Sequence, residues 1–363
     1  MGALKGISKT SRSNLVTYLM VTVAFIIVQT LVSTGSLTNS LTGLLVPICA
    51  YICMAISLNL VVGISGELSL GHAGFMSIGA FSGVVAVACL KGSIANSALL
   101  LVCGLVIGGI LAGVAGFVIG IPVMRLRGDY LAIVTLAFGE IIKNLLNNFY
   151  VGLDDAGLHF SMHDANSLGM HGGTILINGP QGAVGIDKLS TFVAGFVLIL
   201  FCLFVVLNLI HSRSGRAIMA VRDNRIAAES VGINVTKYRL MAFVVSAVLA
   251  GMAGALYAMN YSTIVPKKFD MNTSILILVF VVLGGMGNIR GSIVSATVLT
   301  LLPEMLRVIS DYRMLIYAIV LILVMIVTNN PTLRLFFHGL KNRLLGSFRR
   351  SKGLSTEGGE VDE

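Results

Sequence analysis

Long apolar stretches separated by short polar segments run through most of this chain. A stretch of about 18 to 23 mostly apolar residues is long enough to cross a lipid bilayer as a helix, and the pattern predicts about ten such spans. They lie near residues 14–33, 41–62, 72–90, 96–121, 129–150, 189–211, 240–261, 272–288, 292–309 and 312–328. We therefore expect an all-α fold, a polytopic helical bundle integral to a membrane.

The composition excludes a sizeable soluble domain. Hydrophobic residues make up 56% of the chain and charged residues only 11%, whereas ordinary soluble domains carry about 25% charged residues. The formal net charge is +9, which in a soluble protein could indicate a nucleic-acid partner. Here the basic residues lie beside the apolar spans, which favours membrane orientation and contact with anionic lipid instead. We predict no nucleic-acid partner.

Lysine and arginine are distributed unevenly between the two sides of the predicted bundle. With the N-terminus inside, the inner segments hold about three times as many of these residues as the outer ones, and bases near span ends are retained in the cytoplasm. The bias places residues 1–13 and the C-terminal tail in the cytoplasm, and it makes residues 14–330 a membrane domain. Within it, 151–188 is an extracytoplasmic loop and 212–239 a cytoplasmic loop. The tail, 331–363, is basic and then acidic, typical of a disordered segment.

The most polar interior segment is RSGRAIMAVRDNRIAAESVGINVTKYR, from Arg213 to Arg239. We call this segment the central loop. It carries six basic residues against Asp223 and Glu229. Apolar residues within it recur at helical spacing, so we predict two short helices. Gly232 is expected to end the second helix, because helices commonly stop on a left-handed glycine. From the residues alone, the segment is either a solvated loop that fixes orientation or a docking surface for a partner.

Two glycine clusters indicate irregular backbone within the bundle. The first is GISGELSLGHAGFMSIGAFSG, Gly63–Gly83, and the second is GGMGNIRG, Gly284–Gly291. Irregular backbone at membrane depth is tolerated only against protein or a watery cavity, so a broken or re-entrant helix fits here. The similar spacing of the two clusters also hints at two related halves. Candidate residues for the break or for a translocation pathway are Gly66, Glu67, His72, Glu140, Gly284 and Gly287.

The ionisable members of this set have two interpretations each. Glu67 and His72 could relay protons, or they could sit at the inner interface and cap a helix. Glu140 lies one helical turn from Lys143, so the two could neutralise each other or face a water-filled path for a zwitterion.

No enzymatic or metal-binding motif is present in the sequence. All five cysteines lie in apolar segments, so neither a disulfide framework nor a metal site is expected. A phosphate-binding GxxxxGK[ST] loop is absent because no Gly-Lys dipeptide occurs. We therefore predict that this chain is not an enzyme and binds no cofactor; if nucleotide drives it, another chain binds the nucleotide.

Several strings resemble one transporter family. They are SLNLVVGISGELSLGHAGFMSIGAF (Ser57–Phe81), RLRGDYLAIVTLAFGEII (Arg125–Ile142), the segment Gly215–Ala258 around the central loop, and GGMGNIRGSIVSA (Gly284–Ala296). Together they resemble the LivM-type permease subunits of branched-chain amino acid ABC transporters. The stretch from Asp154 to Thr174 departs from the family pattern and looks like an insertion.

The resemblance implies a set of partners. These would be a second, LivH-type permease, two cytoplasmic ATPase subunits that hold ATP and Mg, and an external substrate-binding protein, all at the cytoplasmic membrane. The central loop would then be the segment that couples to the ATPases. Its candidate coupling residues are Arg216, Arg222, Asp223, Ala227, Ala228, Glu229 and Gly232. The EAAxxxG pattern of importer loops is met except that Ile226 replaces the glutamate.

The resemblance favours import of leucine, isoleucine and valine by alternating access. A similar permease for urea or short-chain amides is an alternative within the same class. A proton-coupled secondary amino acid carrier, using Glu67, His72 and Glu140, is an alternative from a different class.

Overall fold

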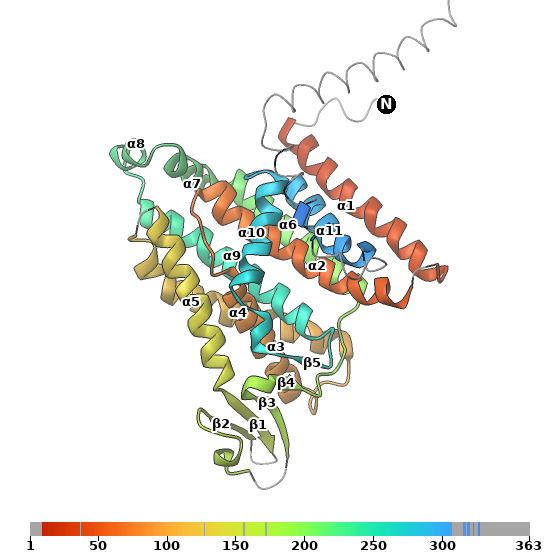
Figure 1. Ribbon diagram of the computed structural model, residues 1–363. Helices are drawn as coiled ribbons and strands as arrows, with labels where there is room; N and C mark the ends of the chain where they lie inside the picture. The colour runs from red at the N-terminus through yellow and green to blue at the C-terminus, as the bar shows by residue number, and fades with distance from the viewer. Residues whose placement is uncertain are drawn as a thin grey trace, which may run out of the picture. The chain divides into compact units, whose positions relative to one another are not determined.

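The computed structural model (Figure 1) describes residues 9–36, 38–126, 128–154, 157–170 and 173–306, with residues 315, 316, 318, 319, 322 and 326 beyond them. The α-helices of the continuous part are α1 (Lys9–Ser33), α2 (Asn39–Asn59), α3 (His72–Leu90), α4 (Ser97–Val123), α5 (Asp129–Asn147), α6 (Phe192–His211), α7 (Arg213–Asp223), α8 (Arg225–Ser230), α9 (Val235–Ala258), α10 (Met271–Gly284) and α11 (Ile289–Met305). Four short helical segments are η1, a π-helix (Leu60–Ser65), and the 3₁₀ turns η2 (Asn166–Leu168), η3 (Gly179–Gln181) and η4 (Pro266–Lys268).

Seven of the described helical segments are long and apolar enough to cross a membrane. They correspond to the first seven predicted spans, from 14–33 to 240–261. The next two predicted spans contain α10 and α11, which have 14 and 17 residues in the described part of the chain and are not among these seven. The predicted span at 312–328 and the tail at 331–363 lie outside the continuously described residues, as do residues 1–8 of the N-terminal segment. The sidedness of both termini stays a prediction.

The core of the bundle is built on α2 and α9. Every residue of α2 from Leu45 to Asn59 is buried except Tyr51, and α9 packs against α2, α3 and α4. Glycines permit this close packing, because small residues let helix backbones approach each other in lipid. A Cβ atom on Gly254 of α9 would lie 1.9 Å from the carbonyl oxygen of Met76 on α3. The glycines of α4 pack in the same way, since a Cβ atom on Gly108 would lie 2.7 Å from the Gly79 carbonyl oxygen.

Apolar side chains also cover much of the outer surface of the helices. Along α4 the exposed ones include Leu99, Val102, Val106, Ile110, Val114, Phe117 and Ile121. So extensive an exposed apolar surface is typical of a protein that faces lipid or other membrane subunits. All five cysteines are free.

The expectation of an all-α fold was incomplete, because the structure contains a five-stranded antiparallel sheet. The strands are β1 (Tyr150–Asp154), β2 (Gly157–Ser161), β3 (Thr174–Asn178), β4 (Ala183–Val184) and β5 (Thr263–Ile264), in the order β2-β1-β3-β4-β5. The first four lie in the segment predicted as an extracytoplasmic loop. The strands are two to five residues long and contain Gly, Asp, His and Asn, so their sequence lacks the alternating β-branched pattern that predicts strands.

The sheet and the α7–α8 pair lie at opposite ends of the bundle (Figure 1). α6 begins shortly after β4 and ends at α7, whereas α9 begins after α8 and ends shortly before β5. Arg222 of α7 contacts η1, which follows α2, and Asn59 at the end of α2 contacts Gly287 in the turn after α10. The two segments predicted to lie on opposite sides of the membrane, 151–188 and 212–239, are therefore at opposite ends of the structure.

Candidate functional site

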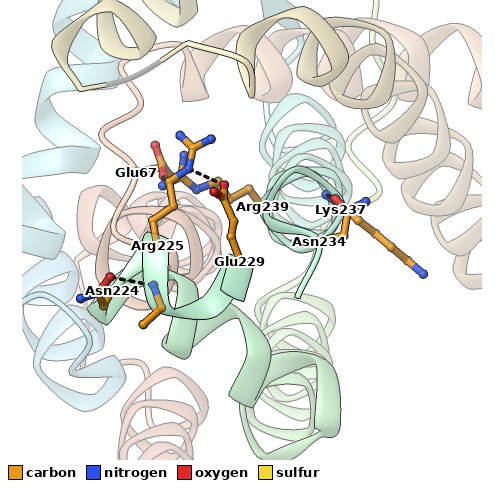
Figure 2. A network of polar contacts seen from close by, with 8 residues as sticks. Glu67, Asn224, Arg225, Glu229, Asn234, Lys237 and Arg239 are labelled. Carbon is orange, nitrogen blue, oxygen red and sulfur yellow. Dashed lines mark hydrogen bonds and ion pairs between the residues drawn. The ribbon is translucent and has the colours of Figure 1, made fainter. Parts of the chain in front are cut away.

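Two asparagines fix the helix boundaries in the central loop (Figure 2). The side-chain oxygen of Asn224 accepts a hydrogen bond of 3.0 Å from the backbone N–H of Ala227, at the start of α8. Asn234 accepts an equivalent bond from the N–H of Lys237 at the start of α9. Each cap satisfies a backbone donor that has no partner within the helix and contributes about 1 kcal/mol. The polar residues of the loop thus divide it into α7 and α8 before the chain returns to the bundle.

Gly232 ends this arrangement, as the sequence predicted. Its φ angle is +83°, and its N–H donates to the carbonyl oxygen of Glu229 at 3.0 Å. The next N–H, of Ile233, donates to the carbonyl oxygen of Ala228 at 3.0 Å, as is usual where a left-handed glycine stops a helix. A small apolar core under the two helices consists of Val221, Ala228 and Val235. The prediction of two short helices is confirmed.

Arg222 connects α7 to the end of the second transmembrane helix. α2 continues as the π-helix η1, which stops at Gly66 with a φ angle of +76°. The guanidinium of Arg222 donates a hydrogen bond of 2.7 Å to the carbonyl oxygen of Gly63, in a helix end where carbonyls lack intrahelical partners. The aliphatic part of Arg222 lies over Gly66, where a Cβ atom would be 2.9 Å from Cγ of the arginine. A cation at this helix end also complements the helix dipole.

The two glycine clusters of the sequence meet at the same place. Asn59 joins them: its side-chain oxygen accepts from the N–H of Gly287 at 2.8 Å, and its amide nitrogen donates to Ser292 Oγ at 2.9 Å. The approach is close, because a Cβ atom on Gly63 would lie 2.3 Å from the backbone nitrogen of Gly287. The irregular segment 60–71, which we call the break, and the turn between α10 and α11 therefore form one unit. α7 contacts this unit through Arg222.

A buried ion pair provides a second connection (Figure 2). Glu67, in the segment after η1, lies 2.8 Å from Arg239 at the start of α9, and the side chains are 9% and 12% exposed. Burial raises the pKa of Glu67, and the charges of Arg239 and Arg225 partly oppose that shift. Arg225 itself forms a more exposed ion pair of 2.9 Å with Glu229 on α8. Positive charge from the loop thus surrounds the only carboxylate of the broken segment.

The residues predicted as a proton relay have separate partners. His72 is buried at the start of α3, and its Nε2 lies 2.8 Å from Ser57 Oγ on α2. Glu67 is paired with Arg239 instead. Within the described part of the chain, no hydrogen bond joins Glu67 to His72. The structure therefore gives each residue a partner on another element and does not arrange the two as a chain of donors and acceptors.

Glu140 lies away from this group, on α5. It forms an ion pair with Lys143 one turn later on the same helix, and the two side chains are 33% and 20% exposed. This ion pair is the mutual contact that one of the two interpretations of the sequence expected.

The other predicted coupling residues are mostly on the outer surface of α7 and α8. Arg216 is exposed and donates to the carbonyl oxygen of His211 at 3.0 Å, and Asp223 is exposed at the end of α7. Ala227 is exposed, whereas Ala228 is buried beneath it. The predicted set therefore divides into residues that face outward and residues that hold the loop together.

Several residues of the site were not among the predicted candidates. Ile226 and Val231 are 80% and 74% exposed and place two apolar side chains on the outer face around α8. Asn59 and Arg239 hold the break to its surroundings. The available signal was a polar Asn59 within an apolar stretch, because a polar residue buried in a membrane bundle requires partners there.

The comparisons with known proteins agree on one family. A family model described as the permease component of branched-chain amino acid transport systems matches residues 40–325. Over 294 residues the chain is 34% identical to the high-affinity branched-chain amino acid transport system permease proteins LivM of Salmonella typhimurium and of Escherichia coli, covering 76% of this chain and 66% of each relative. The ribose import permease protein RbsC of Escherichia coli is 26% identical over 285 residues, 76% of this chain and 81% of RbsC.

The chain spans about two thirds of the length of the LivM relatives that it matches. No solved structure matches the chain. The matched range, 40–325, contains both glycine clusters and the whole of α7 and α8.

Proposed function

Because the chain belongs to the family of permease components of branched-chain amino acid transport systems, we propose that it is the membrane-spanning subunit of an ATP-driven importer of leucine, isoleucine and valine. The chain is a multi-pass membrane protein, and we assign it to the cytoplasmic membrane. The observation that carries the proposal is the family match over residues 40–325. The partners are a second, LivH-type permease, two ATPase subunits that hold ATP and Mg, and an external binding protein.

In this proposal, α8 is the part of the chain that docks on an ATPase subunit. Its outer face combines the exposed apolar side chains of Ile226 and Val231 with the ion pair between Arg225 and Glu229. Apolar side chains in the centre of a contact, surrounded by charged ones, are typical of protein interfaces. Together with Asp223 at the end of α7 and Ala227 of α8, they offer a partner a compact surface on and beside the capped helix α8.

The inner side of the same unit carries the motion into the bundle. Arg222 holds the carbonyl of Gly63, and Arg239 holds the carboxylate of Glu67. When an ATPase moves α8, these two contacts displace the broken segment at 60–71, and through Asn59 the displacement reaches the α10–α11 turn. Irregular helix ends of this kind absorb large changes in backbone angles during switching.

The secondary-carrier alternative gains little support from the geometry. A proton relay needs donors and acceptors within hydrogen-bond reach, and Glu67, His72 and Glu140 have partners on other residues. The similarity to RbsC shows that the chain is also related to a permease named for ribose import. Substrate selectivity is therefore tested in the same assay as the energy source.

The test is uptake by the complete transporter in proteoliposomes. This chain, its partner permease and the ATPases are reconstituted with ATP inside and the binding protein outside, and radiolabelled leucine, urea and ribose are offered in turn. We expect leucine uptake that requires ATP and the binding protein, and no uptake of urea or ribose. Leucine uptake by this chain alone under a pH gradient would establish the carrier instead, and ATP-driven uptake of urea would establish the amide permease.

A further inference from the structure

A lysine at the sheet end of the bundle lies over two tyrosine rings. The Nζ atom of Lys268 is 4.7 Å from the ring centroid of Tyr261 and 5.3 Å from that of Tyr257. Lys268 is the last residue of η4, between β5 and α10, and its side chain is exposed. In the topology that the basic residues predict, this is the outer side of the membrane, where a substrate for import arrives.

The two tyrosines begin a row of aromatic rings that leads into the bundle. The rings of Tyr261 and Tyr257 are 5.1 Å apart between centroids, and those of Tyr257 and Tyr51 are 5.8 Å apart. Tyr257 is only 2% exposed, and Tyr51 is the one residue between Leu45 and Asn59 of α2 that is not buried. The row therefore connects the exposed Lys268 with the middle of the central helix α2.

Lys268 has no acidic partner in the described part of the chain, where the ion pairs involve other residues. The carboxylate nearest in sequence, that of Asp270, caps the N-terminus of α10. Its two oxygens accept hydrogen bonds of 3.0 Å from the N–H of Thr273 and 2.9 Å from the side chain of Asn272. Burial is the largest single influence and would raise the pKa of Asp270, but together the hydrogen bonds outweigh it and the pKa is lowered. Asp270 therefore serves as a helix cap and leaves the ammonium of Lys268 available.

The position of Lys268 is fixed by its backbone. Its N–H donates to the carbonyl oxygen of Val265 at 3.2 Å, and its own carbonyl accepts from Thr273 Oγ1 at 2.8 Å. Although the side chain as a whole is exposed, its ammonium lies against the two rings, and this partial burial lowers the pKa of Lys268. Its charge is therefore partly deprived of water without gaining an anion in exchange. An anion that binds there would offset this cost.

We propose that Lys268, Tyr257 and Tyr261 form a binding site for the carboxylate end of a zwitterionic amino acid on its way into the bundle. This inference rests on the proposed function and names the substrate contact that it requires. The ammonium of Lys268 holds the carboxylate. Tyr261 and Tyr51, which are partly exposed, offer hydroxyl groups to the substrate ammonium and ring faces to an aliphatic side chain, while the buried Tyr257 holds the row in place. A single lysine beside aromatic rings suits one carboxylate attached to an apolar group.

The experiment measures binding of radiolabelled leucine to the purified complex of this chain with its partner permease and ATPases, without the binding protein. Lys268→Met is compared with Lys267→Met, which removes the same charge from the neighbouring exposed residue, and with Lys268→Arg. We expect about 10-fold weaker binding or more for Lys268→Met, from loss of a hydrogen-bonded charge. Lys267→Met should bind leucine as wild type does. Lys268→Arg, which keeps the charge, should bind leucine more tightly than Lys268→Met. Melting temperatures of all variants show whether each is folded.

Two analogues of leucine test which end of the substrate Lys268 binds. Isopentylamine lacks the carboxylate and 4-methylpentanoate lacks the ammonium. In wild type we expect 4-methylpentanoate to compete with leucine and isopentylamine not to compete. In Lys268→Met the advantage of 4-methylpentanoate disappears. Equal competition by the two analogues in wild type would overturn the assignment of the carboxylate to Lys268.

Failure of the site and failure of the proposed function give different results. If wild type imports leucine with ATP and Lys268→Met binds leucine as Lys267→Met does, the site is wrong and the function stands. If Lys268→Met binds leucine as wild type does, and in the uptake assay changes only the half-saturating concentration of the binding protein, Lys268 is a docking residue and the site is again wrong. If wild type binds leucine through Lys268 but does not import it with ATP, the site stands and the proposed function falls. If wild type neither binds nor imports leucine, both fall.

Discussion

The guanidinium of Arg222 donates a hydrogen bond of 2.7 Å to the carbonyl oxygen of Gly63, which joins a polar loop to the end of a transmembrane helix. The two residues are 159 positions apart in the sequence, and their contact lies where α2 has already changed to a π-helix. Such bulges are frequent at functional sites. The contact means that α7 cannot move far without either losing this bond or displacing the break.

We expect Gly63→Ala to disrupt the junction between the two glycine clusters. The new Cβ atom would lie 1.8 Å from the side-chain oxygen of Asn59 and 2.3 Å from the nitrogen of Gly287, and overpacking of this kind costs about 1–3 kcal/mol. The melting temperature of the purified protein should fall by several degrees. Gly43→Ala on the same helix is the control, because a Cβ atom there meets nothing within 4 Å. Equal melting temperatures for the two variants would show that the junction is not tightly packed.

The thermal stability of the protein should depend on pH in a way that reflects the protonation of Glu67. Burial raises the pKa of Glu67 above its ordinary value of 4.5, against the opposing charges of Arg239 and Arg225. A carboxyl with a raised pKa in the folded state contributes stability that is fully present below 4.5 and is lost as the pH rises through the folded value. The melting temperature of wild type minus that of Glu67→Gln should therefore decrease as the pH rises from 4.5 to neutrality.

The two proteins are compared in the same buffers, so that other titrating groups cancel. An increase in this difference with pH would mean that attraction between Glu67 and Arg239 outweighs the cost of burying the carboxylate, contrary to our interpretation.

The exposed face of α8 should matter for ATPase association and not for stability. Ile226 and Val231 are 80% and 74% exposed, so changing both to serine removes little packing within the chain. If they lie at the centre of the contact, the double variant should bind the ATPase about 10-fold more weakly in a pull-down titration. Val184→Ser, at an exposed apolar position of β4 at the opposite end of the bundle, should bind normally. Normal binding by the double variant would place the docking surface elsewhere.

Much of this architecture could be predicted from the sequence, because lipid imposes a strong rule on the composition of spans. Seven spans, the two short helices of the central loop and the stop at Gly232 follow from local patterns. The glycine clusters were also visible as irregular backbone. Their meeting through Asn59 was not, because contacts between residues 228 positions apart leave no local pattern.

The sheet and the polar contacts were beyond local prediction for different reasons. β5 pairs with β4 across the whole of α6 to α9, and strands this short carry a weak periodic signal. Glu67 was assigned to the break, but its partner Arg239 was counted only among the bases of the loop. Composition could identify which residues are charged, whereas the pairing depends on how α9 packs against α2 and α3.

The central claim is that Arg222 transmits motion from the ATPase to the break at Gly63, and Arg222→Met tests it most directly. ATP hydrolysis and leucine uptake are measured together in proteoliposomes, with Arg213→Met, at an exposed arginine of the same helix, as the control. Our account predicts that Arg222→Met still assembles with the ATPases and hydrolyses ATP, while uptake per ATP falls about 10-fold, within the usual range of coupling free energies. Uptake per ATP equal to that of Arg213→Met would contradict the account.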